Sequence, residues 1–333
     1  MPETFLLLGV VIVLASAYNF INGVNDCANA IATTVSTRAL KPYQAVLMAA
    51  VFNTLGAFLT TAVARTIGKG IVDPADINLW ILIFALVGAT IWSGGCSRLG
   101  IPISITHAMV GGLMGAAAAA FGFGTWQWAG IRKILIAMVL SPIAGFIVAY
   151  FFMVAVLWLS RRVAPRKANK FFRVSQILSA AGMAFSHGAN DTQNGMGVIT
   201  AGLVIAGLQS DFHVPLWVIL SSALFMGLGT QIGGWRIIRT MGSRMVRLHP
   251  SHGFSAETSS AVVIFVNSWL GAPISTTQVI ATAIMGVGAT VNINAVRWAL
   301  ARRIVVTWFL TIPGAAAISA GFYYAFHYLF GVA

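Results

Sequence analysis

Acidic residues are the scarcest feature of this sequence. Among 333 residues there are only 7 Asp and Glu, and charged residues of both signs make up 8%, whereas soluble domains usually contain about 25%. This shortage excludes an ordinary soluble domain. The sequence is instead 58% hydrophobic, and apolar runs recur along its length that are long enough, at roughly 20 residues, to cross a bilayer.

Other signals are missing as well. With only two cysteines, Cys27 and Cys96, and no CxxC pair, the sequence has no disulfide framework. The alternating ten-residue segments of an outer-membrane barrel are also missing, and the first apolar run lacks the basic start and cleavage site of a signal peptide. These absences leave an all-α integral membrane protein, with roughly ten to twelve membrane helices or half-helices expected.

Basic residues gather between the apolar runs. The net charge is +13, and the densest clusters lie at 161–173, 236–247 and 297–303. Basic loops beside membrane spans mark the cytoplasmic side and contact anionic lipid, so this charge predicts topology rather than nucleic-acid binding. We predict a multi-pass protein of the cell (inner) membrane, with the central basic loop in the cytoplasm and both termini outside.

Two motifs occur twice. "GVNDCAN" (23–29) recurs as "GANDTQN" (188–194), and "SRLGIPISIT" (97–106) recurs as "SWLGAPISTT" (268–277). The matches include Asn, Asp, Gly, Pro and Ser, and so do not rest on common apolar residues alone. We predict two membrane repeats, 1–160 and 176–333, joined by a basic cytoplasmic linker at 161–175. Duplicated halves of transporters are often inverted, with broken helices at the substrate site, so we expect inverted topology with broken helices or helical hairpins.

The first motif carries two carboxylates in apolar surroundings, Asp26 and Asp191, whereas Glu257 and the other acids are placed near predicted ends or loops. An unpaired carboxylate at membrane depth costs at least about 2.5–3.5 kcal/mol, so a bound cation or a proton is expected there. Flanking amides add hard oxygen donors, and Gly23 and Gly188 are predicted to break the helix. The predicted cation site, with sodium as the candidate ion and no other metal, comprises Asn25, Asp26, Asn29, Asn190, Asp191 and Asn194. The alternative is that these side chains only join helices by hydrogen bonds.

The second motif predicts an anion site at two helix starts. Gly100 and Gly271 end one helix, and Pro102 and Pro273 suit the first position of the next. Hydroxyls, free N–H groups and the helix dipole would then face an anion. The candidate anion-binding residues are Ser104, Thr106, His107, Ser275, Thr276, Thr277 and Gln278. The alternative is ordinary N-capping and helix packing; His107 could donate to the anion, carry a proton or be a buried structural histidine.

Together the motifs resemble those of the inorganic phosphate transporter (PiT) family, over nearly the full length. "GVNDCANAI" and "SHGANDTQNGMGVIT" carry the resemblance, with "GIPISITHAMVGGLMGA" and "GAPISTTQVIATAIMGVG". The resemblance implies a secondary transporter, not an enzyme, that moves phosphate with sodium or protons. It also implies two inverted repeats, a homodimer and no cofactor beyond coupling ions. Asn25, Asp26, Asn190 and Asp191 would then line the cation and substrate region.

The sequence departs from the family pattern at two positions. Ile105 replaces a usual Ser or Thr, and Asn194 stands where many bacterial relatives have Lys, which leaves the coupling ion open between sodium and a proton. The alternative function is a sulfate or related oxyanion permease of the same family. A minor alternative, an integral-membrane enzyme acting on phosphate compounds, would need a nucleophile and base or clustered Arg at membrane depth, whereas the arginine clusters here lie in loops.

Overall fold

Twelve α-helices make up nearly all of the computed structural model, which describes residues 2–72 and 77–331. Within these ranges the only β-type pairing is an isolated bridge between Val72 and Trp126. The helices are α1 (Pro2–Ser36), α2 (Pro42–Gly56), α3 (Ala62–Lys69), α4 (Leu79–Leu99), α5 (Ile105–Phe121), α6 (Trp128–Ser160), α7 (Pro165–Ile205), α8 (Leu216–Ile232), α9 (Trp235–Arg239), α10 (Pro250–Trp269), α11 (Thr276–Ala289) and α12 (Trp298–Phe330). The all-α prediction is confirmed.

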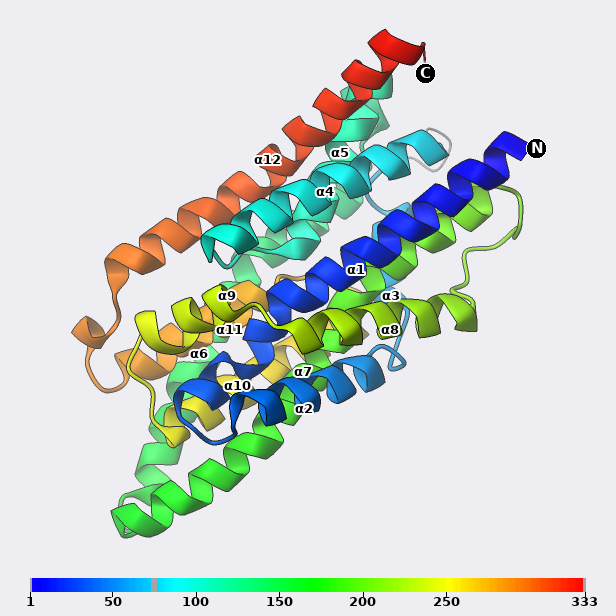
Figure 1. Ribbon diagram of the computed structural model, residues 1–333. Helices are drawn as coiled ribbons and strands as arrows, with labels where there is room; N and C mark the ends of the chain where they lie inside the picture. Colours follow the sequence, from blue (N-terminus) through cyan, green and yellow to red (C-terminus); the bar gives the residue numbers. More distant parts are fainter. Residues whose placement is uncertain (1, 73–76, 332–333) are drawn as a thin grey trace.

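The order of elements in the first half returns in the second. Each half has a long helix with the Asn-Asp motif, a broken helix pair, a hairpin with the Pro-Ile-Ser motif, and a 33-residue helix containing one proline. In Figure 1, α1 runs away from the end that holds both termini, whereas α7 runs toward it; α6 and α12 are opposed in the same way. These directions agree with two inverted repeats, although that relation stays a prediction.

Among the described residues, four helices are long and apolar enough to cross a membrane by length and composition, namely α1, α4, α6 and α12. A fifth span results if α8 and the segment 235–244, bent by 60° at the break, are counted as one. The hairpin helices α5 and α11 are shorter. Full spans and half-helices are therefore combined, as the broken-helix prediction requires.

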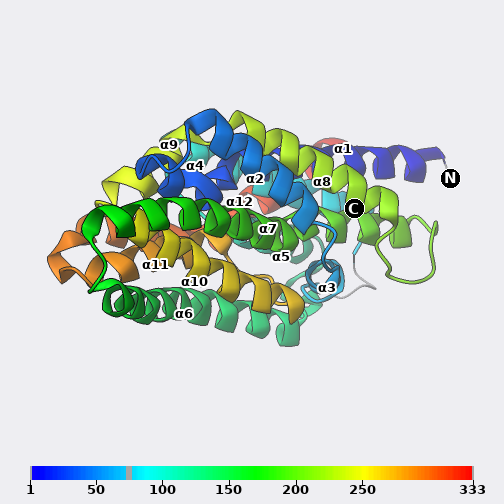
Figure 2. The same ribbon diagram turned by 90° about the horizontal axis from the view of Figure 1, so that it is seen from below.

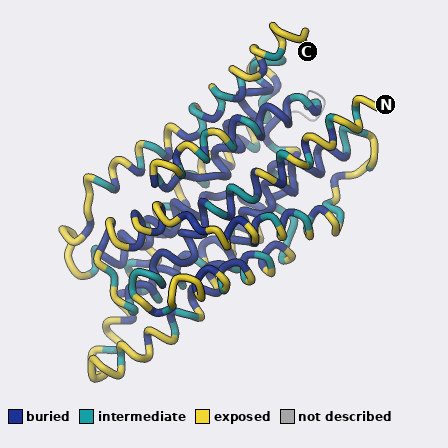
Figure 3. The backbone as a smooth tube through the Cα atoms, viewed as in Figure 1, coloured by how far each residue is buried: buried dark blue, intermediate teal, exposed yellow. Residues whose placement is uncertain are grey.

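The helices α1 and α7 lie at the centre, where they pack on each other and on the elements of both halves. One apolar core includes Tyr18, Phe84 and Leu113, and the other includes Ile31 and Ile280. Helix α1 contributes its first half to one core and residues 27–32 to the other. Its polar segment lies between the two cores, in the buried middle of the bundle (Figure 3).

The prediction that Gly23 and Gly188 break their helices is wrong. Both lie inside continuous helices, α1 and α7. A Cβ at Gly23 would lie 2.2 Å from the carbonyl oxygen of Met226, and one at Gly188 would lie 2.1 Å from that of Asn53. The glycines therefore serve close helix packing, as small residues do in membranes, and not a change of backbone direction.

The breaks at the second motif are confirmed. Gly100 and Gly271 end their helices with φ of +68° and +65°, a conformation that glycine adopts without strain. The prolines, however, do not occupy the first helical position. The helix caps are Ser104 and Ser275, each two residues after its proline, because a serine hydroxyl can accept a first-turn N–H and so sets the helix start. Pro102 and Pro273 lie in the connecting segments.

The basic segment 161–175 is mostly helical. Only residues 161–164 connect α6 to α7, and α7 begins at Pro165, a favoured residue at a first helical position. This corner lies at the end of the bundle opposite both termini (Figure 1).

Candidate functional site

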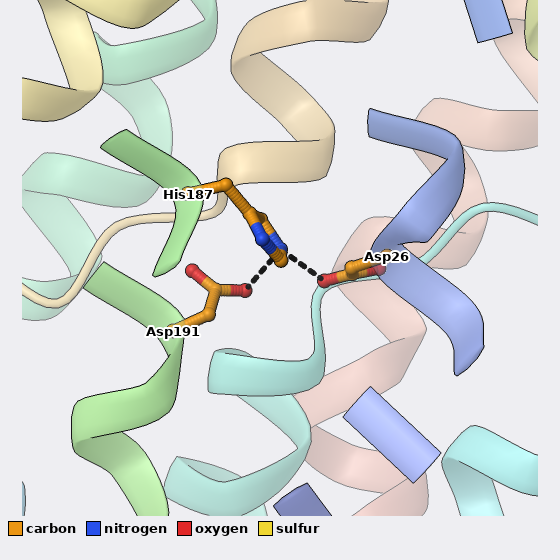
Figure 4. Close-up of side chains that lie close together, drawn as sticks. All are labelled: Asp26, His187 and Asp191. Carbon is orange, nitrogen blue, oxygen red and sulfur yellow. Dashed lines mark ion pairs between the residues drawn. The ribbon is translucent and has the colours of Figure 1, made fainter. Parts of the chain in front are cut away.

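Two carboxylates from different halves meet at one imidazole. The Nε2 of His187 lies 3.8 Å from Oδ2 of Asp26 in α1 and 3.5 Å from Oδ2 of Asp191 in α7. Figure 4 shows the imidazole between the two carboxylates. His187 and Asp191 share one face of α7 because residues four apart are neighbours on a helix. No lysine or arginine among the described residues forms an ion pair with either carboxylate.

A hydrogen-bond chain sets which nitrogen of His187 faces the carboxylates. Thr230 donates its hydroxyl hydrogen to the carbonyl of Met226, at 2.9 Å, so its oxygen accepts from the Asn53 amide at 3.0 Å. The amide oxygen of Asn53 therefore faces Nδ1 of His187, at 3.0 Å, and accepts its hydrogen. The lone pair or second proton of the ring is then at Nε2, which lies between the two carboxylates, where a proton or a cation would offset their negative charge.

The start of α11 supplies hydroxyls to both carboxylates. Thr276 donates to Oδ2 of Asp191 at 3.1 Å, and Thr277 donates to Oδ1 of Asp26 at 3.2 Å. The amide of Asn29 donates to the same two threonine hydroxyls, at 3.2 and 3.0 Å. Residues predicted separately as cation ligands and anion ligands are thus in direct contact.

The first hairpin makes the corresponding contact from the other side. Asn194 of α7 donates to Thr106 at the start of α5, at 2.9 Å, and Tyr18 donates to the carbonyl of Ile105 at 3.0 Å. Ile105 occupies the position that corresponds to Thr276 and has no hydroxyl. Within the described residues, α11 is the hairpin helix whose hydroxyls bond both aspartates.

The serines at the two helix starts serve as caps. The hydroxyl of Ser104 accepts the N–H of His107, and that of Ser275 accepts the N–H of Gln278, each at 3.1 Å. The alternative reading, N-capping, is therefore correct for these oxygens as acceptors, while each hydroxyl hydrogen is left available. Neither ring nitrogen of the buried His107 has a hydrogen-bond partner.

Two predicted cation ligands, Asn25 and Asn190, make no hydrogen bond to either carboxylate. Asn190 directs its amide nitrogen to Ser268 and to the carbonyl of Ala272, at 2.9 and 3.4 Å, and not to a carboxylate. Asn25 makes no side-chain hydrogen bond, and both its amide atoms are buried. Asn190 thus ties α7 to the α10–α11 hairpin, while Asn25 contributes an unpartnered amide near the centre.

All predicted binding residues are buried, none more than 3% exposed, so this conformation is closed to solvent. Buried polar atoms are normally hydrogen-bonded, yet atoms without a hydrogen-bond partner gather here. They are Asn25 Oδ1 and Nδ2, Asp26 Oδ2, Asn29 Oδ1, His107 Nδ1 and Nε2, His187 Nε2, Asn190 Oδ1, Asp191 Oδ1, Asn194 Oδ1 and Gln278 Oε1. Most are oxygens, the donor type that hard cations prefer, and Asp26, His187 and Asp191 bring three ligand atoms within 4.8 Å of one another. The donor set fits a cation beside an anion.

Sequence reasoning placed Glu257 near a predicted end or loop, and the structure shows it fully buried. Its Oε1 accepts from Thr33 at 2.5 Å, Thr34 at 2.8 Å and Gln176 at 3.0 Å, and its Oε2 accepts from Ser179 at 2.5 Å. These donors join α1, α7 and α10 around one carboxylate. Its sequence neighbours are mostly small and polar, and its donors are remote in sequence, so no local pattern indicated this burial.

His187 and Asn53 are the other residues that sequence reasoning left unassigned. The spacing of His187 from Asp191 was a usable signal, since both must share one helix face. Asn53 lies in a mostly apolar segment, which is a weaker signal. Its partner is 134 residues away.

Known proteins resemble this chain over most of its length. The model of the "Phosphate transporter family" matches residues 22–319. A "Probable low-affinity inorganic phosphate transporter" of Rhizobium meliloti (strain 1021) is 45% identical over 323 residues, covering 96% of this chain and 97% of the relative. A protein of the same name from Bacillus subtilis (strain 168) is 41% identical over 332 residues, covering 98% of this chain and 100% of the relative.

A solved structure, "The sodium-dependent phosphate transporter", matches with a TM-score of 0.86 and 27% identity, covering 97% of this chain and 99% of that one. These relatives are named as transporters, in agreement with the prediction that the chain is not an enzyme. The motifs, the closed polar centre and the family match lead to one conclusion: the chain belongs to the phosphate transporter family, as its sequence resemblance predicted.

Proposed function

We propose that this protein carries inorganic phosphate across the cell membrane together with a cation, and that sodium is the coupling ion. The observation that carries the proposal is the meeting of Asp26 and Asp191, one from each half, at a buried centre contacted by the starts of hairpin helices. Such midplane sites between repeats are where secondary transporters bind substrate and ions.

Charge supports symport. Asp26 and Asp191 bring two negative charges, and His187 offsets at most one of them. A phosphate anion bound beside them would add further negative charge in a poorly solvated site, where like charges repel strongly. Cations bound in the same conformation lower this repulsion, so phosphate and cation each raise the affinity for the other.

Sodium is supported by the oxygen-rich donor set and by the likeness to a solved transporter that is named as sodium-dependent. Proton coupling is the second candidate, favoured by one observation: Nε2 of His187 lies between both carboxylates, where a proton would also offset their charge. The two candidates differ in whether a sodium gradient or a pH gradient drives uptake.

The anion is proposed to be phosphate and not sulfate. Phosphate at neutral pH keeps a proton that it can donate to a carboxylate, whereas sulfate has none. The carboxylates here contact the threonines of the anion-site motif directly, so an anion at α11 would lie beside an acceptor. Unlabelled sulfate that competes as well as unlabelled phosphate in counterflow would contradict this choice.

The test is uptake of labelled phosphate into proteoliposomes under an inward sodium gradient or an inward proton gradient. We expect sodium-driven accumulation that Asp26→Asn and Asp191→Asn abolish. Asp211→Asn is the matched control, because Asp211 is exposed, and it should transport normally. Uptake that is insensitive to sodium but follows the proton gradient would refute sodium coupling. It would indicate instead that a proton at His187 is the coupling ion.

A further inference from the structure

A groove at the corner between α6 and α7 combines an apolar interior with a basic rim. Its cavity of about 530 Å³ is lined by residues from the end of α6 and the start of α7, together with Phe254 of α10. The α10 ribbon lies beside those of α6 and α7 (Figure 2). Phe152, Phe171, Phe172 and Phe254 line it, and Lys167 lies at its edge. The ring centroid of Phe254 lies 5.9 Å from that of Phe152 and 5.8 Å from that of Phe172.

Charge of one sign lies around the groove. Lys167 lines it, and Arg161, Arg162, Arg166, Lys170 and Arg173 lie in the same segment of the chain, 161–173, which we call the basic rim; all six residues are exposed. The sequence has no Asp or Glu between residues 77 and 190. The acid nearest the groove in sequence, Glu257, is buried and already accepts four hydrogen bonds. The rim is therefore complementary to an anion from outside the chain.

The surrounding surface is suited to the membrane boundary. Trp158 is 59% exposed and Phe171 63% exposed, and the guanidinium carbon of Arg161 lies 4.7 Å from the ring centroid of Trp158. Aromatic and basic side chains of this kind gather at the level of lipid headgroups. The corner thus offers apolar space for a chain and cations for a headgroup within one structure.

We propose that this groove binds an anionic phospholipid, with an acyl chain along the phenylalanines and the phosphate at the basic rim. A larger groove of about 690 Å³ between α2 and α8 serves as an internal comparison, because its lining, including Leu47, Phe58 and Trp217, contains no charged side chain. That groove can take apolar chains but cannot select a negative headgroup. The lipid groove is separate from the transport centre, and its assignment does not rest on the proposed function.

The charge arm of the test measures lipid retained by the purified full-length protein, using native mass spectrometry with phosphatidylglycerol or phosphatidylcholine. Arg166→Gln/Lys167→Gln/Lys170→Gln should weaken phosphatidylglycerol binding about 100-fold, since each basic residue near a membrane surface contributes roughly fivefold. Arg297→Gln/Arg302→Gln/Arg303→Gln removes equal charge from another cluster and should leave this site unchanged. Equal loss in both triple variants, or equal retention of phosphatidylcholine by the unaltered protein, would refute the site.

A second part of the test fills the groove with a bulky side chain and leaves every charge in place. Ala155 lines the groove and is exposed, so Ala155→Trp should block the acyl chain and lower retention about tenfold. Val154→Trp places the same side chain on the neighbouring, exposed position outside the groove and should have no effect. Full retention by Ala155→Trp would refute the proposal.

Two further results would assign the groove or its rim to another occupant. Dissociation of an oligomer by Ala155→Trp, without loss of lipid, would make the groove a contact between copies of the chain. Displacement of phosphatidylglycerol by millimolar inorganic phosphate would show that the rim binds free phosphate instead.

Discussion

Replacing Gly188 by alanine tests a close helix contact beside the site. A Cβ at this position would lie 2.1 Å from the carbonyl oxygen and 2.7 Å from the Cα of Asn53, and these are backbone atoms that no rotamer change can move. Overpacking of this kind typically costs about 1–3 kcal/mol. Because alanine also favours the helix over glycine by about 1 kcal/mol, we expect a net cost of up to about 2 kcal/mol.

The control comes from the same helix. A Cβ at Gly182 would meet nothing within 4 Å, so Gly182→Ala should gain the helix preference, about 1 kcal/mol, without a clash. Thermal denaturation of the purified proteins should then separate the two variants by about 1–3 kcal/mol in free energy of unfolding.

Phosphate uptake by the two variants should rank in the same order as their stability. Separation of α2 from α7 would lengthen the hydrogen bond between Asn53 and His187 and so shift the imidazole from its position between the carboxylates. We therefore expect phosphate uptake to fall in Gly188→Ala and to persist in Gly182→Ala. Equal stability and uptake in both variants would show that the helices can separate without consequence, which would refute a role for this close contact.

Two other changes test neighbouring features. Glu257→Gln removes the charge that strengthens four hydrogen bonds, so it should lower the free energy of unfolding, measured by thermal denaturation, by about 1–3 kcal/mol. Glu3→Gln, at an exposed position, should leave the free energy of unfolding unchanged. Equal effects of the two substitutions would contradict a specific role for the buried carboxylate. Ser275→Gly should cost the helix start only a few tenths of a kcal/mol but remove a hydroxyl donor, so the apparent Km for phosphate should rise at unchanged thermal stability. An unchanged Km would count against an anion at the start of α11.

Much of the site was accessible from the sequence because its chemistry is rare in its surroundings. Asp26 and Asp191 stand in apolar segments where a carboxylate is costly, and the duplication of their motifs separates function from chance. Gly100 and Gly271 likewise indicate helix ends, because few other residues adopt the left-handed conformation that such an end requires.

The tertiary structure decided those features of the site that depend on contacts between residues far apart in the sequence. Gly23 and Gly188 lie in the continuous helices α1 and α7, where they pack closely against backbone carbonyls of α8 and α2. No local sequence pattern reveals these contacts. In the same way, the meeting of Asp26 with Thr277 joins residues 251 positions apart. Local sequence determines which side chains are chemically unusual and where helices end, whereas packing between helices determines which of those side chains share one site.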